Sequence, residues 1–447
     1  MSSQNYLKQT LIGTALVIAT LLALSLVPEF DVGSFHFKKV NILADILVKP
    51  RAVEETVPDT VAVVKPLYAD TCKQGVVCVE DFTPDTSGLD LFFAALEKAQ
   101  SRPVRIAWFG DSYVEGDILL QPLRDTLQAL FGGSGVGFVP VTSEVAGFRQ
   151  TVTHTYKGWT TYEIVGKHEK EIPLGPAGYT GIPLEGNYVS YKAVKYARLN
   201  RLPSIKFFYG QSLNSSIKYY LNDSAYTQVL ENGEGLHKLS IAQAVNSFKV
   251  EAQPSDRLAV YGASFESATG VILDNFSMRG NSGIGLSLVG EKMLHDFDSM
   301  HHYDLVILSY GLNVANEKSK TYDWYVRSMN PTIAMVRKAF PNSAILIVGC
   351  SDRADKIDGE LKSMPSVKRL VNEQRKMAAA NGVCFWDLRQ AMGGDSTMIR
   401  WAEIPKRPLA NKDYTHLTFQ GGKKVADIFL NTLLYEREKY ERKKKSR

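Results

Sequence analysis

Residue types that together perform acyl transfer occur at two distant places in the chain. Ser112 follows an apolar run in IAWFGDSYVEG, and Asp413 and His416 lie three positions apart in NKDYTHLTF. A serine hydroxyl becomes a nucleophile when a histidine accepts its proton, and a carboxylate can orient that histidine. These residues suit a serine-dependent hydrolase, provided that the fold brings the two segments together.

Each segment also has a purely structural interpretation. Ser112 and Glu115 fit the S-x-x-E pattern of a helix capping box, in which the serine side chain bonds to the backbone. Asp413 fits the N-cap of the last helix, with His416 on the surface. Neither segment decides by itself between the two interpretations.

Two further segments supply groups that can stabilise negative charge. Asn313 lies in LSYGLNVAN, and Gly280 and Gly283 lie in NFSMRGNSGIG, each after a strand-like run. Ester cleavage passes through a tetrahedral oxyanion, which backbone N–H groups and an asparagine amide stabilise. Four short segments at predicted strand ends therefore supply a nucleophile, oxyanion donors and a base, in that order.

The elements that position these segments alternate between strands and helices. Buried strands are predicted from the apolar runs VRIAWF, YDLVILSYG (303–311), SAILIVGC (343–350) and GVCFWDL (382–388). Helices are predicted at Leu89–Ala99, 323–340, 366–381 and 419–437, with Pro331 as a kink or early break. This alternation indicates βαβ units and an α/β domain with a covered parallel sheet.

Residues 141–265 interrupt that alternation. Segments such as NYVSYKAVKYARL and PSIKFFYG alternate apolar with polar residues at a period of two, and turn signals separate them. The pattern predicts an inserted β-sandwich or jelly roll. Most of its many tyrosines, and Trp159, are expected to fill its core, while exposed rings could stack on sugars.

The N-terminus predicts a membrane anchor. Residues 10–28 (TLIGTALVIATLLALSLVP) carry no charge, and nineteen residues in a helix extend about 28 Å, close to the thickness of a bilayer core. Because no clear cleavage site follows, we expect an uncleaved signal anchor in the inner membrane with the catalytic part in the periplasm. The formal charge of +5 over 447 residues argues against a nucleic-acid partner.

The cysteines fit an oxidising compartment. Cys72 and Cys78 bracket a short loop that a disulfide could close, a pairing that the sequence leaves open. Cys350 and Cys384 are expected to be buried free thiols. The expected organisation is a signal anchor (1–30), a spacer (31–88), a hydrolase domain (89–140 and 266–437), an inserted β-rich domain (141–265) and a basic tail (438–447).

In four blocks the sequence resembles the SGNH (GDSL-type) hydrolases: GDS at 110–112, a glycine in RGNSG, Asn313 in GLN, and DYTH at 413–416. The resemblance implies a flavodoxin-like three-layer α/β/α fold, with Ser112 as nucleophile, His416 as base and Asp413 as its orienting group. It also implies an oxyanion hole of Ser112, Gly283 and Asn313. Gly283 is preferred to Gly280 because N-S-G is similar to the second block of the family.

One position departs from the family pattern. The third block often reads GxND, whereas Val314 stands at the place of the acid, which puts a supporting contact in doubt. The order of blocks, the β-rich insert and SYGLNVAN resemble the peptidoglycan O-acetylesterases of Gram-negative bacteria, in which the insert is similar to a carbohydrate-binding module. The resemblance implies an acetylated glycan, peptidoglycan above all, as substrate.

Several functions remain open. The same residues could transfer the acetyl group to a glycan hydroxyl instead of water, which would make the protein an O-acetyltransferase. A lipase or thioesterase, and a non-catalytic envelope glycan-binding protein, are further alternatives. No cofactor is expected, and no metal, because no acidic or cysteine ligand pattern accompanies His295, His301 and His302.

Overall fold

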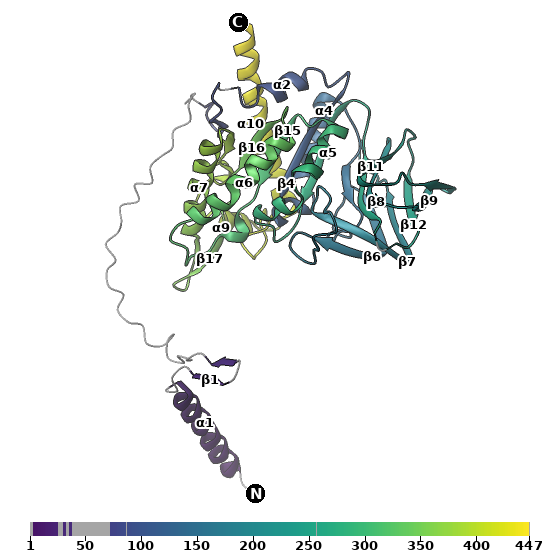
Figure 1. The fold of residues 1–447 in the computed structure, drawn as a ribbon. Coiled ribbons are helices and arrows are strands. Elements are labelled where there is room, and N and C mark those ends of the chain that lie inside the picture. Colours follow the sequence, from purple (N-terminus) through teal and green to yellow (C-terminus); the bar gives the residue numbers. More distant parts are fainter. Residues whose placement is uncertain are drawn as a thin grey trace. The chain divides into compact units, whose positions relative to one another are not determined.

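The computed structural model describes residues 3–25, 30–32, 35–37, 72–85, 87–255 and 257–446 (Figure 1). The chain forms two units, Met1–Ala62 and Val63–Arg447. The first contains helix α1 (Ser3–Ser25) and an antiparallel hairpin of β1 (Phe30–Val32) and β2 (Phe35–Phe37). Most of the predicted spacer, residues 38–71, lies outside the described residues.

Helix α1 overlaps the predicted anchor, residues 10–28, of which 26–28 lie outside the described residues. Within the described part of the chain, no helix is both long enough and apolar enough to cross a bilayer. The membrane anchor is therefore not confirmed.

A six-stranded sheet forms the centre of the second unit, in the order β14-β4-β15-β16-β19-β3. The first five strands are parallel, which confirms the predicted α/β sheet. In chain order they are arranged 2-1-3-4-5, the flavodoxin-like arrangement. The strands are β3 (Glu80–Asp81), β4 (Pro103–Gly110), β14 (Gly270–Ser277), β15 (Leu305–Ser309), β16 (Ala344–Val348) and β19 (Cys384–Trp386).

Helices cover both faces of this sheet, so its central strands are buried apolar runs. One layer packs α5 on α6 and α6 on α7, and the other packs α10 on α4 and α2. The helices are α2 (Asp90–Leu96), α3 (Ser112–Glu115), α4 (Leu120–Phe131), α5 (Glu291–His301), α6 (Asp323–Ala339), α7 (Pro365–Asn381), α8 (Leu388–Met392), α9 (Thr397–Ala402) and α10 (Phe419–Lys445). Two 3₁₀ turns, η1 (Ile284–Leu288) and η2 (Leu312–Val314), and a hairpin of β17 (Ala354–Ile357) and β18 (Glu360–Ser363) complete this part.

The predicted C-terminal boundary of the spacer, residue 88, is wrong. Residues up to 88 were expected to lie outside the domain, but β3 pairs antiparallel with β19 as an edge strand. The carbonyl of Val77 accepts hydrogen bonds from Trp386 Nε1 and Thr432 Oγ1. A two-residue strand is too short to show a periodic pattern, so only its sheet partner reveals it. Cys72 and Cys78, just before it, form a disulfide, and Cys350 and Cys384 are buried free thiols.

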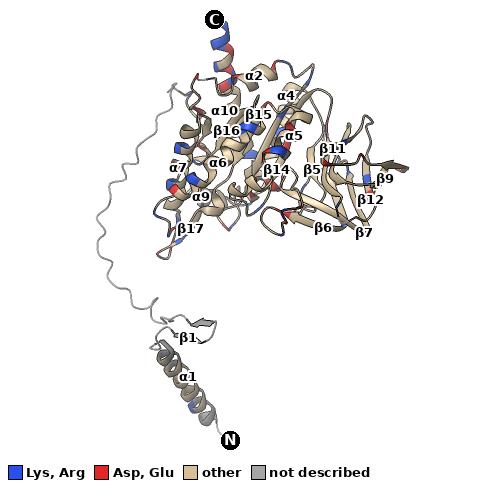
Figure 2. Ribbon diagram, in the orientation of Figure 1, with Lys and Arg blue, Asp and Glu red and all other residues tan. Residues whose placement is uncertain are grey.

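The prediction of a separate C-terminal tail is also wrong. Residues 438–447 were expected to be a basic tail, but α10 continues to Lys445, and the ribbon in Figure 2 shows Lys and Arg positions, in blue, at its end. Lys443 and Lys444 pair with Asp90 and Glu97 at 2.9 and 2.8 Å. These acidic partners on and beside α2 keep the helix end against the domain.

Helix α6 runs without interruption through Pro331, where an early break was one expectation.

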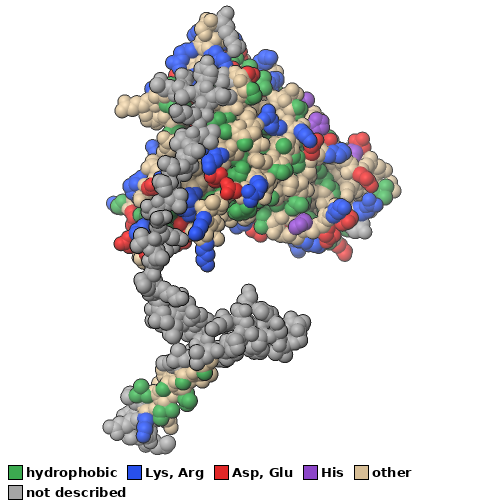
Figure 3. All heavy atoms as spheres, turned by 60° about the vertical axis from the view of Figure 1, so that its left-hand side comes forward, with side chains coloured by type: hydrophobic (Ala, Val, Ile, Leu, Met, Phe, Trp, Pro, Cys, Tyr) green, Lys and Arg blue, Asp and Glu red, His purple; other side chains and the backbone are tan. Residues whose placement is uncertain are grey.

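On the face shown in Figure 3, acidic and basic side chains lie side by side.

The β-rich part consists of nine strands in one hydrogen-bonded sheet. The expected start at residue 141 is too late, because the first of these strands, β5, begins at Gly137 and pairs with β13. The strands are β5 (Gly137–Pro140), β6 (Thr153–Glu163), β7 (Tyr179–Lys192), β8 (Ile205–Ser212), β9 (Ser216–Leu221), β10 (Ser224–Val229), β11 (Gly233–Ile241), β12 (Ser247–Ala252) and β13 (Ala259–Phe265).

The β-sandwich or jelly roll predicted for this part is formed from one hydrogen-bonded sheet. Two groups, β10-β9-β12-β7-β6 and β5-β13-β8-β11, are joined by the single pair Val260 and Gly181. Rings from both groups pack together, with Tyr191 5.0 Å from Phe265 between ring centres. Strand β7 is fourteen residues long, so one part of it pairs with β13 and another with β12, which joins the two layers.

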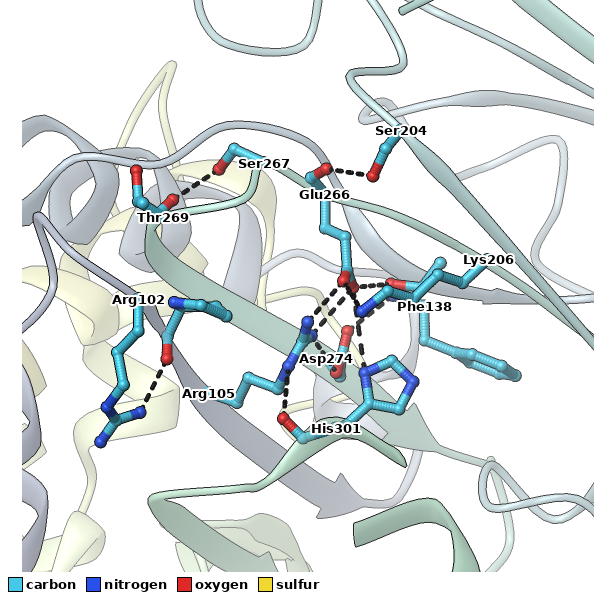
Figure 4. A network of polar contacts seen from close by, with 12 residues as sticks. Arg102, Arg105, Phe138, Ser204, Lys206, Glu266, Ser267, Thr269, Asp274 and His301 are labelled. Atoms are coloured by element: carbon cyan, nitrogen blue, oxygen red, sulfur yellow. Dashed lines mark hydrogen bonds and ion pairs between the residues drawn. The ribbon is translucent and has the colours of Figure 1, made fainter. Parts of the chain in front are cut away.

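A buried ionic network lies where the β-rich part meets the α/β sheet (Figure 4). Arg105 of β4 donates to Glu266, which follows β13, at 2.9 Å, and Lys206 of β8 also pairs with Glu266. Asp274 of β14 lies 3.9 Å from Arg105. Burial alone would raise the pKa of Glu266, but the charges around it, Arg105 foremost, hold that pKa well below its usual range.

Candidate active site

Ser112 lies at the carboxyl end of β4, where the chain turns into α3. The N-cap of this helix is Asp111, whose side chain accepts the N–H of Tyr113 at 3.0 Å. The capping interpretation of Ser112 is therefore wrong. Its hydroxyl instead lies 3.0 Å from Nε2 of His416, a residue 304 positions away in the sequence.

Asp413 holds the other side of the histidine ring. Its Oδ2 lies 2.7 Å from His416 Nδ1, and its Oδ1 accepts the backbone N–H groups of Thr415 and His416 at 3.0 Å each. Burial would raise the pKa of Asp413, but these hydrogen bonds from His416 and Thr415 lower it overall. The carboxylate therefore stays ionised, and Thr418, not Asp413, caps α10.

Asn313 lies in η2 after β15, within reach of the serine loop. Its amide donates to Asp111 Oδ2 at 3.2 Å and to the carbonyl of Asn281 at 3.0 Å. These bonds place the amide between the loops that follow β4 and β14. A substrate oxyanion would compete with Asp111 for one of the two amide hydrogens.

The structure does not place Gly283 as the expected oxyanion donor. Its N–H donates to Asn281 Oδ1 at 2.9 Å, and a Cβ at this position would lie 2.8 Å from Tyr310. Gly283 thus packs closely against the side chain of Tyr310, and its φ is +91°.

Gly280, the alternative, is exposed on the same loop with φ at +72°. Within the described part of the chain, its N–H has no hydrogen-bond partner, and the same holds for the N–H of Ser112. Gly280 is therefore the better candidate for the second backbone donor. Gly280 and Gly283 are three residues apart in the sequence, which does not show which of them is the donor. The direction of each N–H in the folded loop distinguishes the two candidates.

Asp111 is an ionisable group that sequence reasoning did not assign to the site. It is 3% exposed, and burial raises its pKa to about 6 despite the hydrogen bond from Tyr113 N–H and the charge of His416. Its two oxygens fix both the first turn of α3 and the amide of Asn313. Asp111 is thus a positioning residue between the nucleophile and the oxyanion donor.

Glu115 supports the other side of α3 and was also missed as a site residue. Its side chain, 4% exposed, accepts from Arg279 Nε at 2.9 Å and from the hydroxyl of Tyr179 on β7 at 2.9 Å. Arg279 precedes Gly280, so this contact ties the nucleophile helix, the glycine loop and the β-rich part together. The S-x-x-E spacing placed Glu115 in the first turn, but its partners come from distant segments.

These contacts bring together the hydroxyl of Ser112, the imidazole of His416 and the carboxylate of Asp413, while the amide of Asn313 is bonded to Asp111, directly before the serine. The histidine can accept the serine proton while the carboxylate stabilises the imidazolium that forms. Among the described residues, no group of three or more histidine, cysteine or acidic side chains is placed to hold a metal ion. The chemistry that the geometry allows is nucleophilic acyl transfer.

A flavodoxin-like parallel sheet that carries a serine–histidine–aspartate relay at its carboxyl edge, with the four sequence blocks on adjoining loops, is the layout of the SGNH hydrolases. Comparison with solved structures shows a shared fold. No protein family model and no curated relative matches the sequence.

A solved peptidoglycan O-acetylesterase matches with a TM-score of 0.66 at 20% sequence identity, over 81% of this chain and 99% of that one. An acetylxylan esterase from Geobacillus stearothermophilus matches with a TM-score of 0.27 at 16% identity, over 37% of this chain and 73% of that one. The periplasmic domain of a lipopolysaccharide acetyltransferase from Salmonella ser. Paratyphi A matches with a TM-score of 0.29 at 13% identity, over 37% and 74%. The first comparison shows a shared fold over most of both chains.

Proposed function

We propose that this protein is a serine esterase that removes O-acetyl groups from a cell-envelope polysaccharide, peptidoglycan above all, through an acetyl-serine intermediate. The relay from Ser112 Oγ through His416 to Asp413, with distances of 3.0 and 2.7 Å, carries this proposal. A hydroxyl already within hydrogen-bond distance of its base needs no rearrangement to lose its proton.

In the first half of the reaction, His416 takes the proton of Ser112 as Oγ attacks the acetyl carbonyl carbon. The oxyanion is stabilised by the N–H groups of Ser112 and Gly280 and by the amide of Asn313. The tetrahedral intermediate collapses, the sugar oxygen leaves with the proton from His416, and the acetyl group stays on Ser112.

In the second half, His416 takes a proton from water, whose oxygen attacks the acetyl-serine. A second tetrahedral intermediate collapses, Ser112 regains its proton from His416, and acetate leaves. Each turnover thus consumes one ester and one water and produces one sugar hydroxyl, one acetate and one proton.

The substrate and the location are supported by separate observations. The solved structure that shares the fold over most of its length is described as a peptidoglycan O-acetylesterase. The Cys72–Cys78 disulfide and the uncharged segment 10–28 support a periplasmic domain held at the inner membrane. In the periplasm the enzyme would have access to acetylated peptidoglycan.

The test is acetate release from O-acetylated peptidoglycan by the full chain, with Ser112→Ala as the inactive variant and the exposed Ser101→Ala as control. We expect Ser112→Ala to lower the rate at least about 10³-fold and Ser101→Ala to leave it unchanged. Mass spectrometry of a quenched reaction should find one acetyl group on the peptide that contains Ser112. Equal acetate release by Ser112→Ala and the parent would contradict the proposal, and acetyl transfer to an added glycan in place of acetate release would identify a transferase.

A further inference from the structure

Arg353 lies in the loop that leaves the carboxyl end of β16, next to the loop that carries Asn313. Its Nη1 donates to the carbonyl of Leu312 at 3.2 Å, the residue directly before Asn313. The guanidinium therefore lies beside the oxyanion donor.

The backbone around Arg353 is fixed on two sides. The N–H of Ala354 donates to the carbonyl of Tyr414 at 3.1 Å, two residues before His416. The carbonyl of Arg353 accepts the N–H of Met364 at 2.8 Å, at the start of α7. The side chain thus extends from a fixed backbone position between the loops that bring Asn313 and His416 to the nucleophile.

The charge of Arg353 has no carboxylate partner within the described part of the chain. Other arginines that follow strands of this sheet do have one: Arg279, in the loop after β14, pairs with Glu115, and Arg389, in α8 after β19, pairs with Asp395. Arg353 instead makes a single hydrogen bond, to a backbone carbonyl. It therefore contributes an uncompensated positive charge next to the loop that carries Asn313.

The remaining N–H groups of this guanidinium are also unused by the described residues. Nε is buried without a hydrogen-bond partner. Nη2 makes no protein hydrogen bond and does not belong to the buried unpartnered atoms, so it faces solvent. A partly buried cation that keeps free donors beside a reaction centre indicates a missing anionic partner.

We propose that Arg353 binds a carboxylate of the substrate and so directs the enzyme to acetyl esters on acidic glycans. The inference rests on the proposed esterase function and adds the class of glycan. A planar guanidinium presents parallel N–H groups that match the two oxygens of a carboxylate, and such charge-assisted bonds are stronger than neutral ones. A neutral acetylated glycan would leave this group unpaired.

The experiment compares the full chain with Arg353→Ala, Arg353→Lys and the control Arg201→Ala. Arg201 is an exposed arginine of the β-rich part whose Nη2 donates to a backbone carbonyl, that of Ala244, at 2.8 Å. Hydrolysis is measured on acetylated polygalacturonate, on acetylated xylan and on 4-nitrophenyl acetate. The last, a small neutral ester, reports whether the catalytic centre is intact.

We expect Arg353→Ala to lower kcat/KM on acetylated polygalacturonate about 10- to 100-fold, mostly through KM, because one charge-assisted hydrogen-bonded contact is lost. Activity on acetylated xylan and 4-nitrophenyl acetate should change less than about 3-fold. Arg353→Lys should retain part of the preference, and Arg201→Ala all of it. Equal losses on the acidic and the neutral glycan, or no loss on the acidic one, would overturn the assignment.

A binding measurement separates this inference from the esterase function. Calorimetry with acetylated oligogalacturonate compares Ser112→Ala with Ser112→Ala/Arg353→Ala, and neither protein needs to turn over. Weaker binding of the double variant supports the role of Arg353 even if no ester is hydrolysed. Unchanged binding together with Ser112-dependent hydrolysis retains the esterase and rejects the acidic-glycan preference.

Discussion

At the scale of single residues, the site depends on which groups are buried and which hydrogens are already engaged. Ser112 keeps its hydroxyl for His416 because Asp111 caps α3 in its place. Gly283 N–H is occupied by Asn281, which leaves Gly280 as the candidate backbone donor. Small differences in hydrogen-bond direction therefore decide the role of each residue.

Asp111 should give the stability of the protein a distinct pH dependence. Because the folded state raises its pKa from 3.8 to about 6, the native protein binds this proton more tightly than the unfolded chain. Asp111 therefore contributes its full stabilisation below pH 3.8, the pKa of the unfolded chain. This contribution, about 3 kcal/mol of unfolding free energy, is lost as the pH rises through about 6. Urea unfolding between pH 4 and pH 8 measures this.

The variant Asp111→Asn should lack this part of the pH dependence, while the exposed Asp223→Asn should keep it. The difference in unfolding free energy between the parent and Asp111→Asn should therefore change with pH below about 6 and be constant above it. Parallel pH curves for the parent and Asp111→Asn would show that Asp111 titrates normally.

At the scale of elements, α10 must begin very close to the turn that precedes α4. Gly421 and Gly422 lie in the first turn of α10, where a Cβ on Gly422 would overlap the backbone of Ile118. Two glycines weaken a helix, and close backbone approach explains their presence here. The position of α10 matters because its N-cap, Thr418, is two residues from His416.

Gly422→Ala should therefore destabilise the fold and displace the base. We expect a loss of about 1–3 kcal/mol in unfolding free energy from overpacking, and a fall in kcat that exceeds the fall caused by Gly147→Ala. Gly147 suits as control because a Cβ there would meet nothing within 4 Å. Urea unfolding and ester hydrolysis measure the two effects, and a Gly422→Ala protein as stable as the control would contradict the close approach.

At the scale of the whole molecule, the β-rich part and the α/β sheet share a core and a buried ionic network. Phe138 and Phe208 of the β-rich part pack against Phe297 of α5, with ring centres 5.7 and 4.6 Å apart. Arg105 and Glu266, 1% and 2% exposed, join the same two parts beside them (Figure 4). The two parts should therefore unfold together.

Glu266→Gln should destabilise the molecule by about 3–5 kcal/mol, because the buried charge of Arg105 loses its hydrogen-bonded carboxylate and keeps only Asp274, at 3.9 Å. The matched control is Glu234→Gln, whose exposed pair with Arg257 at 3.8 Å should be worth about 0–1 kcal/mol. Urea unfolding monitored by tryptophan fluorescence and by far-ultraviolet circular dichroism provides the measurement. Comparable stabilities of the two variants would show that the network does not hold the parts together.

The sequence by itself determined the features that depend on residues near one another in the chain. The apolar run before Ser112, the spacing of Asp413 and His416, and the alternation of strands and helices are local patterns, because backbone conformation and burial impose short periods. The same patterns indicated the parallel sheet, which the structure confirms. They did not reveal β3, which is too short to carry a period.

Tertiary structure alone decided which distant groups meet. The contact between Ser112 and His416 spans 304 positions, and the partners of Arg353, Glu115 and Asp111 likewise come from other segments. Whether Gly280 or Gly283 presents a free N–H depends on how one loop folds around Asn281. The burial of a side chain and the direction of its hydrogen bonds are set only when the layers of the fold pack together. The spacing of residues along the chain therefore does not predict them directly.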